Sequence, residues 1–159
     1  MPSVTLASFN AAPADEAVSV MLACCASRRF ARAMADGRPY PSADAAAAAV
    51  RAAVESLTWD DVLEAMSAHP RIGAATDTRS AGEQSGVGDA SRAALAAGNR
   101  AYEDRFGHVF LICATGLSGE HMLSALRHRL RNDFSTERRV ATAELAKITD
   151  LRVRKAIGS

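Results

Sequence analysis

The chain has 159 residues, of which 48% are hydrophobic, so it is long enough to form one domain with a hydrophobic core of its own. Its formal net charge of +1 argues against binding to nucleic acid or to an anionic membrane surface. The three cysteines, Cys24, Cys25 and Cys113, form no disulfide framework and are typical of buried thiols in a reducing compartment.

The N-terminal residues contain no basic segment followed by an apolar stretch. The longest apolar runs fall well short of the roughly 18 residues that a membrane-spanning helix needs. These features predict a soluble, cytoplasmic protein.

Alanine is abundant, and apolar residues recur at helical spacing between short breaks of Gly, Pro and Ser. We therefore predict an all-α fold in which residues 1–159 form a single-domain bundle of about seven helices. The helices are expected to start at Asn10 and Arg28, after Ser42 and Thr58, at Asp89, and after Ser118 and Ser135.

Two segments do not fit this helical pattern. Residues 71–88 are rich in Gly, Ser, Thr and Asp, which indicates a long loop carrying about one helical turn, and loops of this length are often functional. Residues 109–114 form a continuous apolar run, whose periodicity does not distinguish a strand from a buried helix.

Three positions carry side chains suited to catalysis or binding, each with two interpretations. His69 precedes a proline at the end of a predicted helix, where an imidazole either transfers protons or bonds the last helical carbonyls. Ser80 and Glu83 have the spacing of a helix capping box, although the nearby glycines would also let the backbone approach a ligand. Arg152 lies on the apolar face of the last predicted helix, so it either extends to water or binds an anionic partner.

The remaining histidines, His108, His121 and His128, lack the spacing of a metal site, so we expect no metal. The sequence also contains no glycine-rich phosphate loop and no nucleophile elbow. No nucleotide is expected.

Several motifs in a fixed order resemble one known family. They are His69-Pro70-Arg71-Ile72-Gly73, Ser80-x-x-Glu83-Gln84, Asn99-x-x-Tyr102-x-x-Arg105-Phe106-Gly107-His108-Val109-Phe110, Arg129-Leu130-x-Asn132, Glu137, and Ile148-x-x-Leu151-Arg152-Val153. This arrangement resembles 2-oxo-4-hydroxy-4-carboxy-5-ureidoimidazoline (OHCU) decarboxylase, and the resemblance extends from Phe9 to Ile157.

The resemblance implies an all-α homodimer that converts a small ureidoimidazoline, OHCU, to (S)-allantoin in urate degradation, without a metal or an organic cofactor. It implies that His69 is the catalytic proton donor and Glu83 the catalytic carboxylate. The positions that it assigns to substrate binding are Pro70, Ser80, Gln84, Phe110, Leu111, Ile112, Cys113, Ala114 and Arg152. The chain departs from some family members at Arg71-Ile72 and at His108-Val109, which concerns the shape of the pocket more than the reaction.

Two other functions stay open on the sequence. The arginines between residues 127 and 139 would suit a non-catalytic helical module that binds a partner through a basic surface. A hydrolase acting on a neighbouring ureide is the other alternative, although the sequence offers no metal cluster or nucleophile triad to activate water.

Overall fold

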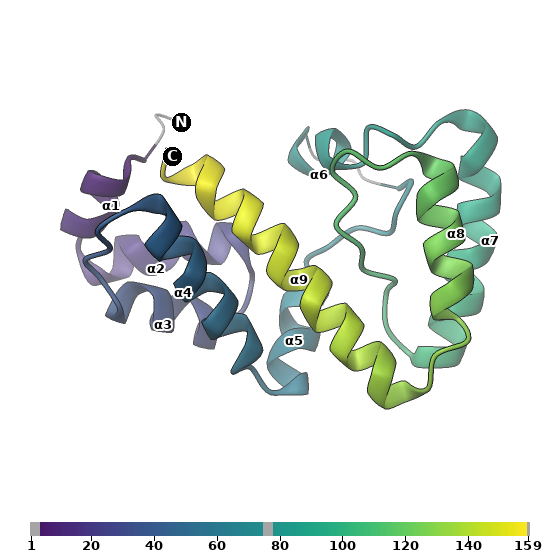
Figure 1. Ribbon diagram of the computed structural model, residues 1–159, viewed down its shortest axis with the longest axis horizontal. Coiled ribbons are helices and arrows are strands. Elements are labelled where there is room, and N and C mark those ends of the chain that lie inside the picture. The colour runs from purple at the N-terminus through teal and green to yellow at the C-terminus, as the bar shows by residue number, and fades with distance from the viewer. Residues whose placement is uncertain (1–3, 75–77, 159) are drawn as a thin grey trace. The chain divides into compact units, whose positions relative to one another are not determined.

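Figure 1 shows the computed structural model of the chain, which describes residues 4–74 and 78–158. All regular secondary structure within these residues is helical. The helices are α1 (Leu6–Ala11), α2 (Ala14–Cys24), α3 (Arg28–Asp36), α4 (Ala43–Glu55), α5 (Trp59–Met66), α6 (Thr78–Glu83), α7 (Asp89–Phe106), α8 (Gly119–Arg129) and α9 (Phe134–Ala156). The predicted all-α class is confirmed.

The described residues form nine helices, two more than the sequence suggested. The first predicted helix is divided into α1 and α2, because the residue before Pro13 is forced out of the helical region and adopts ψ 150°. The second addition is α6, a helix of six residues that corresponds to the helical turn expected within the predicted loop. The predicted start at Asn10 is wrong: Thr5 caps α1 in a capping box with Ser8.

The other predicted helix starts were mostly right. The hydroxyls of Ser42 and Ser118 accept hydrogen bonds from the first turns of α4 and α8. Thr58 and Asp61 form the expected reciprocal pair before α5. Ser135 is the exception, since the carboxylate of Asp133 accepts the bond from Thr136 N–H at the start of α9.

The chain divides into two compact units. The terminal unit contains the residues up to Ala65 and those from Leu145 onward, and the central unit contains residues 66–144. Helix α9 contributes residues to both. That residues 1–159 make one domain stays a prediction.

The core of the terminal unit is formed by α1 to α4 and the last part of α9. Helices α2 and α3 pack against each other, and Phe9, Met21 and Phe30 are fully buried there. The side chain of Asn10 makes two hydrogen bonds to the backbone of Tyr40. Its Oδ1 accepts from the Tyr40 N–H, and its Nδ2 donates to the Tyr40 carbonyl, each at 2.9 Å. The connection between α3 and α4 is thereby tied to α1.

The core of the central unit lies between α7, α8 and the segment 109–114. Leu95, Tyr102, Phe110, Met122 and Leu126 are buried together in it. Helices α7 and α8 lie side by side (Figure 1), closely enough that an added Cβ at residue 98 would lie 2.9 Å from a Leu126 methyl. Glycine at position 98 therefore permits this packing.

In the described part of the chain, no helix has both the length and the apolar character needed to cross a membrane.

Candidate active site

His69 lies just beyond the C-terminal end of α5, as predicted. Its backbone N–H donates to the carbonyl of Met66 at 3.0 Å and closes the last turn of the helix. The side chains of His69 and Pro70 are partly buried. The main chain of His69 therefore satisfies one helical carbonyl, and both interpretations of its imidazole stay predictions.

The segment that follows His69 is fixed by side chains from two other elements. Gly73 adopts φ +87°, and the N–H of Ala74 bonds back to Arg71 at 3.0 Å, so the segment makes a tight turn. The Nδ2 of Asn99 donates to the Ile72 carbonyl at 3.1 Å. The Gly73 N–H donates to Oε1 of Gln84 at 2.9 Å.

The segment 80–84 is helical up to Glu83, the last residue of α6. Ser80 is buried, and Glu83 and Gln84 are partly buried. Because Ser80 and Glu83 both lie within the helix, and the N–H of Gln84 bonds to the Ser80 carbonyl, the capping-box interpretation is wrong.

The glycines after α6 bring two parts of the backbone together. An added Cβ at Gly86 would overlap the Leu117 carbonyl oxygen, and the Gly119 N–H donates to the Gly86 carbonyl at 2.9 Å. Gly86 thus allows a close approach to the chain's own backbone, and the approach to a ligand that the sequence suggested stays a prediction.

Residues 109–114 form neither a strand nor a helix. Four of the five predicted site-lining residues in this segment are buried, and Cys113 is partly buried. The Leu111 carbonyl accepts from Arg129 Nη1 at 2.7 Å, and the Cys113 N–H donates to Glu144 Oε1 at 3.1 Å. These side chains hold the backbone of the segment through hydrogen bonds that a strand partner does not supply.

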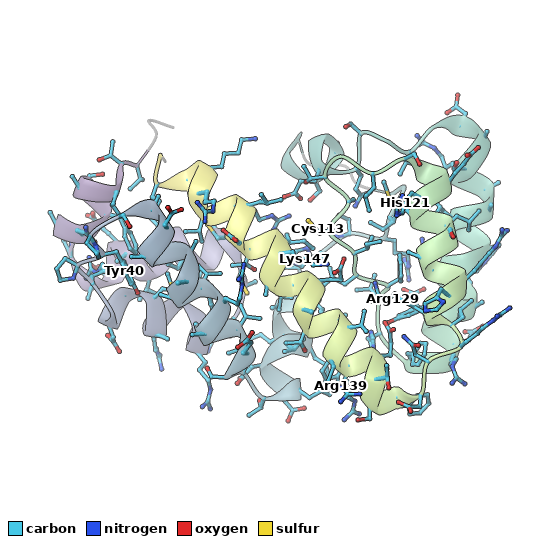
Figure 2. The ribbon with its side chains drawn as sticks, viewed as in Figure 1. Tyr40, Cys113, His121, Arg129, Arg139 and Lys147 are labelled. Atoms are coloured by element: carbon cyan, nitrogen blue, oxygen red, sulfur yellow. The ribbon has the colours of Figure 1, made fainter. Side chains whose placement is uncertain are left out.

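A buried ion pair supports that segment, and the sequence did not reveal it. Arg129 donates to both carboxylate oxygens of Glu137, its Nη2 lying 2.6 Å from Oε2. The Tyr102 hydroxyl donates to the same Oε2 at 2.6 Å. Burial, together with the neighbouring Glu137 carboxylate, raises the pKa of Tyr102, so the phenol stays protonated. Figure 2 labels Arg129 on α8.

The burial of Arg129 corrects the predicted basic surface. Its side chain is inside the central unit, whereas Arg127, Arg131, Arg138 and Arg139 are exposed. Arg129 follows Met122 and Leu126 on the apolar face of α8 at helical spacing, so the sequence did contain a signal for its burial. The exposed arginines that remain are typical of a solvated helix surface.

Arg152 belongs to the terminal unit and is partly buried, whereas the other predicted site residues belong to the central unit. It lies close enough to Cys25 for its charge to favour the thiolate. Burial has the larger and opposite effect, and it raises the pKa of the Cys25 thiol from 9.0 to about 11. This thiol is therefore protonated at neutral pH.

The central unit thus contains all the predicted catalytic and binding residues except Arg152. Within the described residues, no group of three or more His, Cys, Asp or Glu side chains is arranged to hold a metal ion.

Known proteins are similar to this chain along most of its length. The family model for OHCU decarboxylase matches residues 10–154. The chain is 36% identical over 144 residues to the uric acid degradation bifunctional protein TTL of Arabidopsis thaliana, covering 83% of this chain and 44% of that protein. It is 32% identical over 138 residues to the OHCU decarboxylase of Amia calva, covering 80% and 79% of the two chains.

The fold is also similar to a solved structure. A crystal structure of OHCU decarboxylase in the presence of (S)-allantoin has a TM-score of 0.78 and 33% sequence identity, and the match covers 87% of this chain and 96% of that one. The chain spans less than half the length of the Arabidopsis protein.

Proposed function

Because this chain belongs to the OHCU decarboxylase family, we propose that it converts OHCU to (S)-allantoin and CO2 in urate degradation. The observation that carries the proposal is the placement of the residues that match the family's motifs. His69, Ser80, Glu83, Gln84 and residues 110–114 lie in one compact unit, where Gln84 binds the turn that follows His69.

The reaction can proceed without an electron sink supplied by the protein. When the bond to the carboxylate carbon breaks, CO2 leaves and the electron pair passes into the conjugated C=N system of the substrate ring. A proton must then be added to form the new C–H bond. Positioning of the substrate and delivery of this proton are the tasks left to the side chains.

We assign these tasks as the family resemblance implies. His69 delivers the proton to one face of the intermediate, and Glu83 contacts the hydroxyl and carboxylate end of the substrate. Arg152 and backbone amides hold its anionic and amide groups, with Pro70, Ser80, Gln84 and residues 110–114 lining the site. Delivery from one side gives a single enantiomer, and stereocontrol is the main gain over spontaneous decay.

The same resemblance supports two of three further parts of the proposal. The enzyme uses neither a metal nor an organic cofactor, and it forms a homodimer. The third part, action in the cytoplasm, is supported instead by the three cysteines, which are typical of buried thiols in a reducing compartment. Sedimentation velocity of the purified chain tests the second part. A single species with the mass of a monomer across the accessible concentration range would contradict it.

The test of the activity generates OHCU in situ from urate with urate oxidase and 5-hydroxyisourate hydrolase. Circular dichroism of the product is followed with and without this protein. Rapid appearance of optically active (S)-allantoin is the expected result. Slow formation of racemic product at the rate of the control without protein would contradict the decarboxylase.

The role of His69 is tested by His69→Asn in the same assay. The rate should fall by roughly 100- to 10,000-fold, the range that general acid–base catalysis contributes. Far-UV circular dichroism should be unchanged. His121→Asn is the matched control, because His121 is exposed on α8 (Figure 2) and should retain full activity. Retained activity and stereochemistry in the His69 variant would exclude the role.

A further inference from the structure

One peptide group in the central unit is held on both sides by side-chain amides. The carbonyl of Ile72 and the N–H of Gly73 belong to the same peptide bond. Asn99 Nδ2 donates to that carbonyl at 3.1 Å, and Gln84 Oε1 accepts from that N–H at 2.9 Å. A planar peptide whose two polar groups are both bound cannot rotate without breaking a hydrogen bond.

This peptide connects the two proposed catalytic residues. Ile72 lies three residues after His69, and Gln84 directly follows Glu83 at the end of α6. Through this peptide, the segment that follows His69 is hydrogen-bonded to Gln84, the residue next to Glu83. Asn99, on α7, supplies the fixed support for this connection.

Asn99 is a buried residue whose carboxamide bonds to the main chain. It is 2% exposed, and its Nδ2 donates to the Ile72 carbonyl at 3.1 Å. A hydrogen bond in a buried position is stronger than one in water, so the amide holds the peptide more firmly than an exposed side chain would.

The other anchor of the same turn is weaker. Arg71 Nε lies 2.8 Å from Glu103 Oε1, but the arginine side chain of this pair is 62% exposed. Exposed ion pairs contribute little and are screened by salt. The bonds from Asn99 and Gln84 are therefore the contacts that restrict the turn.

We infer that Asn99 is a positioning residue, which fixes the Ile72–Gly73 peptide and so sets the geometry of the His69 imidazole relative to the Glu83 carboxylate. The inference rests on the proposed decarboxylase function. Asn99 itself does not touch the substrate. Its effect is exerted on proton delivery, because small displacements of a reacting group are costly in rate.

Two variants test this role, each of which removes the amide. Asn99→Ala leaves a small space, and Asn99→Leu fills it with an apolar side chain, so agreement between them isolates the lost hydrogen bond. In both, kcat should fall roughly 10- to 100-fold. KM should change less than kcat, because the segment 110–114, which supplies most of the residues assigned to substrate binding, is held by Arg129 and Glu144 instead.

Asn10→Ala is the matched control. Asn10 also holds a backbone segment through its carboxamide, at Tyr40 in the terminal unit, and it loses two hydrogen bonds in this variant. Its Tm should fall while kcat stays at the wild-type value. A fall in the kcat of Asn10→Ala equal to that of the Asn99 variants would overturn the inference. It would mean that the loss of any hydrogen bond between a carboxamide and the backbone lowers kcat, wherever it lies in the chain.

A second readout does not depend on turnover. Hydrogen exchange of the Gly73 amide, followed by NMR, should be faster in both Asn99 variants than in the wild type, and unchanged in Asn10→Ala. A wild-type protein without decarboxylase activity would overturn the proposed function and the positioning role with it. An active wild type together with Asn99 variants of unchanged kcat, or of raised KM and unchanged kcat, would overturn the positioning role alone.

Discussion

Arg129 and Glu137 form an ion pair inside the central unit, with side chains that are 6% and 0% exposed. The carboxylate also accepts hydrogen bonds from the Tyr102 hydroxyl and from Asn132 Nδ2, and the guanidinium donates to the Leu111 carbonyl. Each charge is therefore met by several partners, the condition under which a buried ion pair is tolerated. The pair fixes the segment 109–114 that the proposed site requires.

Removal of one partner should be costly. Glu137→Ala leaves the Arg129 charge buried without its carboxylate, and the free energy of unfolding should fall by about 3–5 kcal/mol. Urea denaturation measures the change. Glu103→Ala is the control, because its partner Arg71 is 62% exposed and the pair should contribute less than about 1 kcal/mol. Equal losses in the two variants would contradict this account of the buried pair.

Gly86 should tolerate no side chain. Its Cβ would overlap the Leu117 carbonyl oxygen, so Gly86→Ala must displace backbone and should destabilise the protein by about 1–3 kcal/mol or more. Gly82→Ala is the matched control, since a Cβ there meets no heavy atom within 4 Å, and Ala is favoured over Gly inside a helix by about 0.5–1 kcal/mol. Thermal unfolding should show Tm changes of opposite sign in the two variants.

Features set by neighbouring residues could be predicted from the sequence. The caps at Ser42, Thr58 and Ser118 depend on residues within three positions, and each was predicted correctly. The apolar stripes likewise predicted the all-α class. The error at the first helix arose because Pro13 overrides an otherwise helical pattern.

Features set by distant residues could not be predicted in this way. The bonds of Asn99 to Ile72 and of Gln84 to Gly73 join residues 27 and 11 positions apart, and no local pattern indicates either one. The helical turn expected within the loop 71–88 is α6, although its position was not predicted, because Ser80 and Gly82 are weak helix formers. The motif order predicts which residues act in the site, and the contacts show which backbone carbonyls Asn99 and Arg129 hold.

The buried thiol of Cys25 should make the protein less stable in alkali. Its pKa is raised from 9.0 to about 11 by burial, so the folded state favours the protonated thiol. The resulting stabilisation is fully present below about pH 9, and it is lost as the pH rises toward 11, because the unfolded chain ionises first. One pKa unit corresponds to about 1.4 kcal/mol, so the loss amounts to about 3 kcal/mol at most.

Urea denaturation of the wild type and of Cys25→Ala between pH 8 and pH 11 tests this expectation. The difference in unfolding free energy between the two proteins should shrink across that range. Tyr102, whose pKa is also raised by burial, is present in both proteins and cancels in the comparison. A difference that stays constant with pH would show that the thiol ionises equally in the folded and unfolded states.

A substitution of Arg152 should show whether its guanidinium binds the substrate or has only a structural role. If its guanidinium binds the substrate, Arg152→Lys keeps the charge but loses the planar arrangement of donors that suits a carboxylate. KM should rise by roughly 10- to 100-fold, the equivalent of a lost charge-assisted hydrogen bond of about 1.5–3 kcal/mol.

Arg154→Ala is the control on the same helix, because Arg154 pairs with Asp44 and Asp150 at 2.9 and 2.7 Å and has no proposed contact with substrate. Its KM should match the wild type. Equal KM values for Arg152→Lys and the wild type would return Arg152 to the simpler role of a helix residue that extends its charge to water.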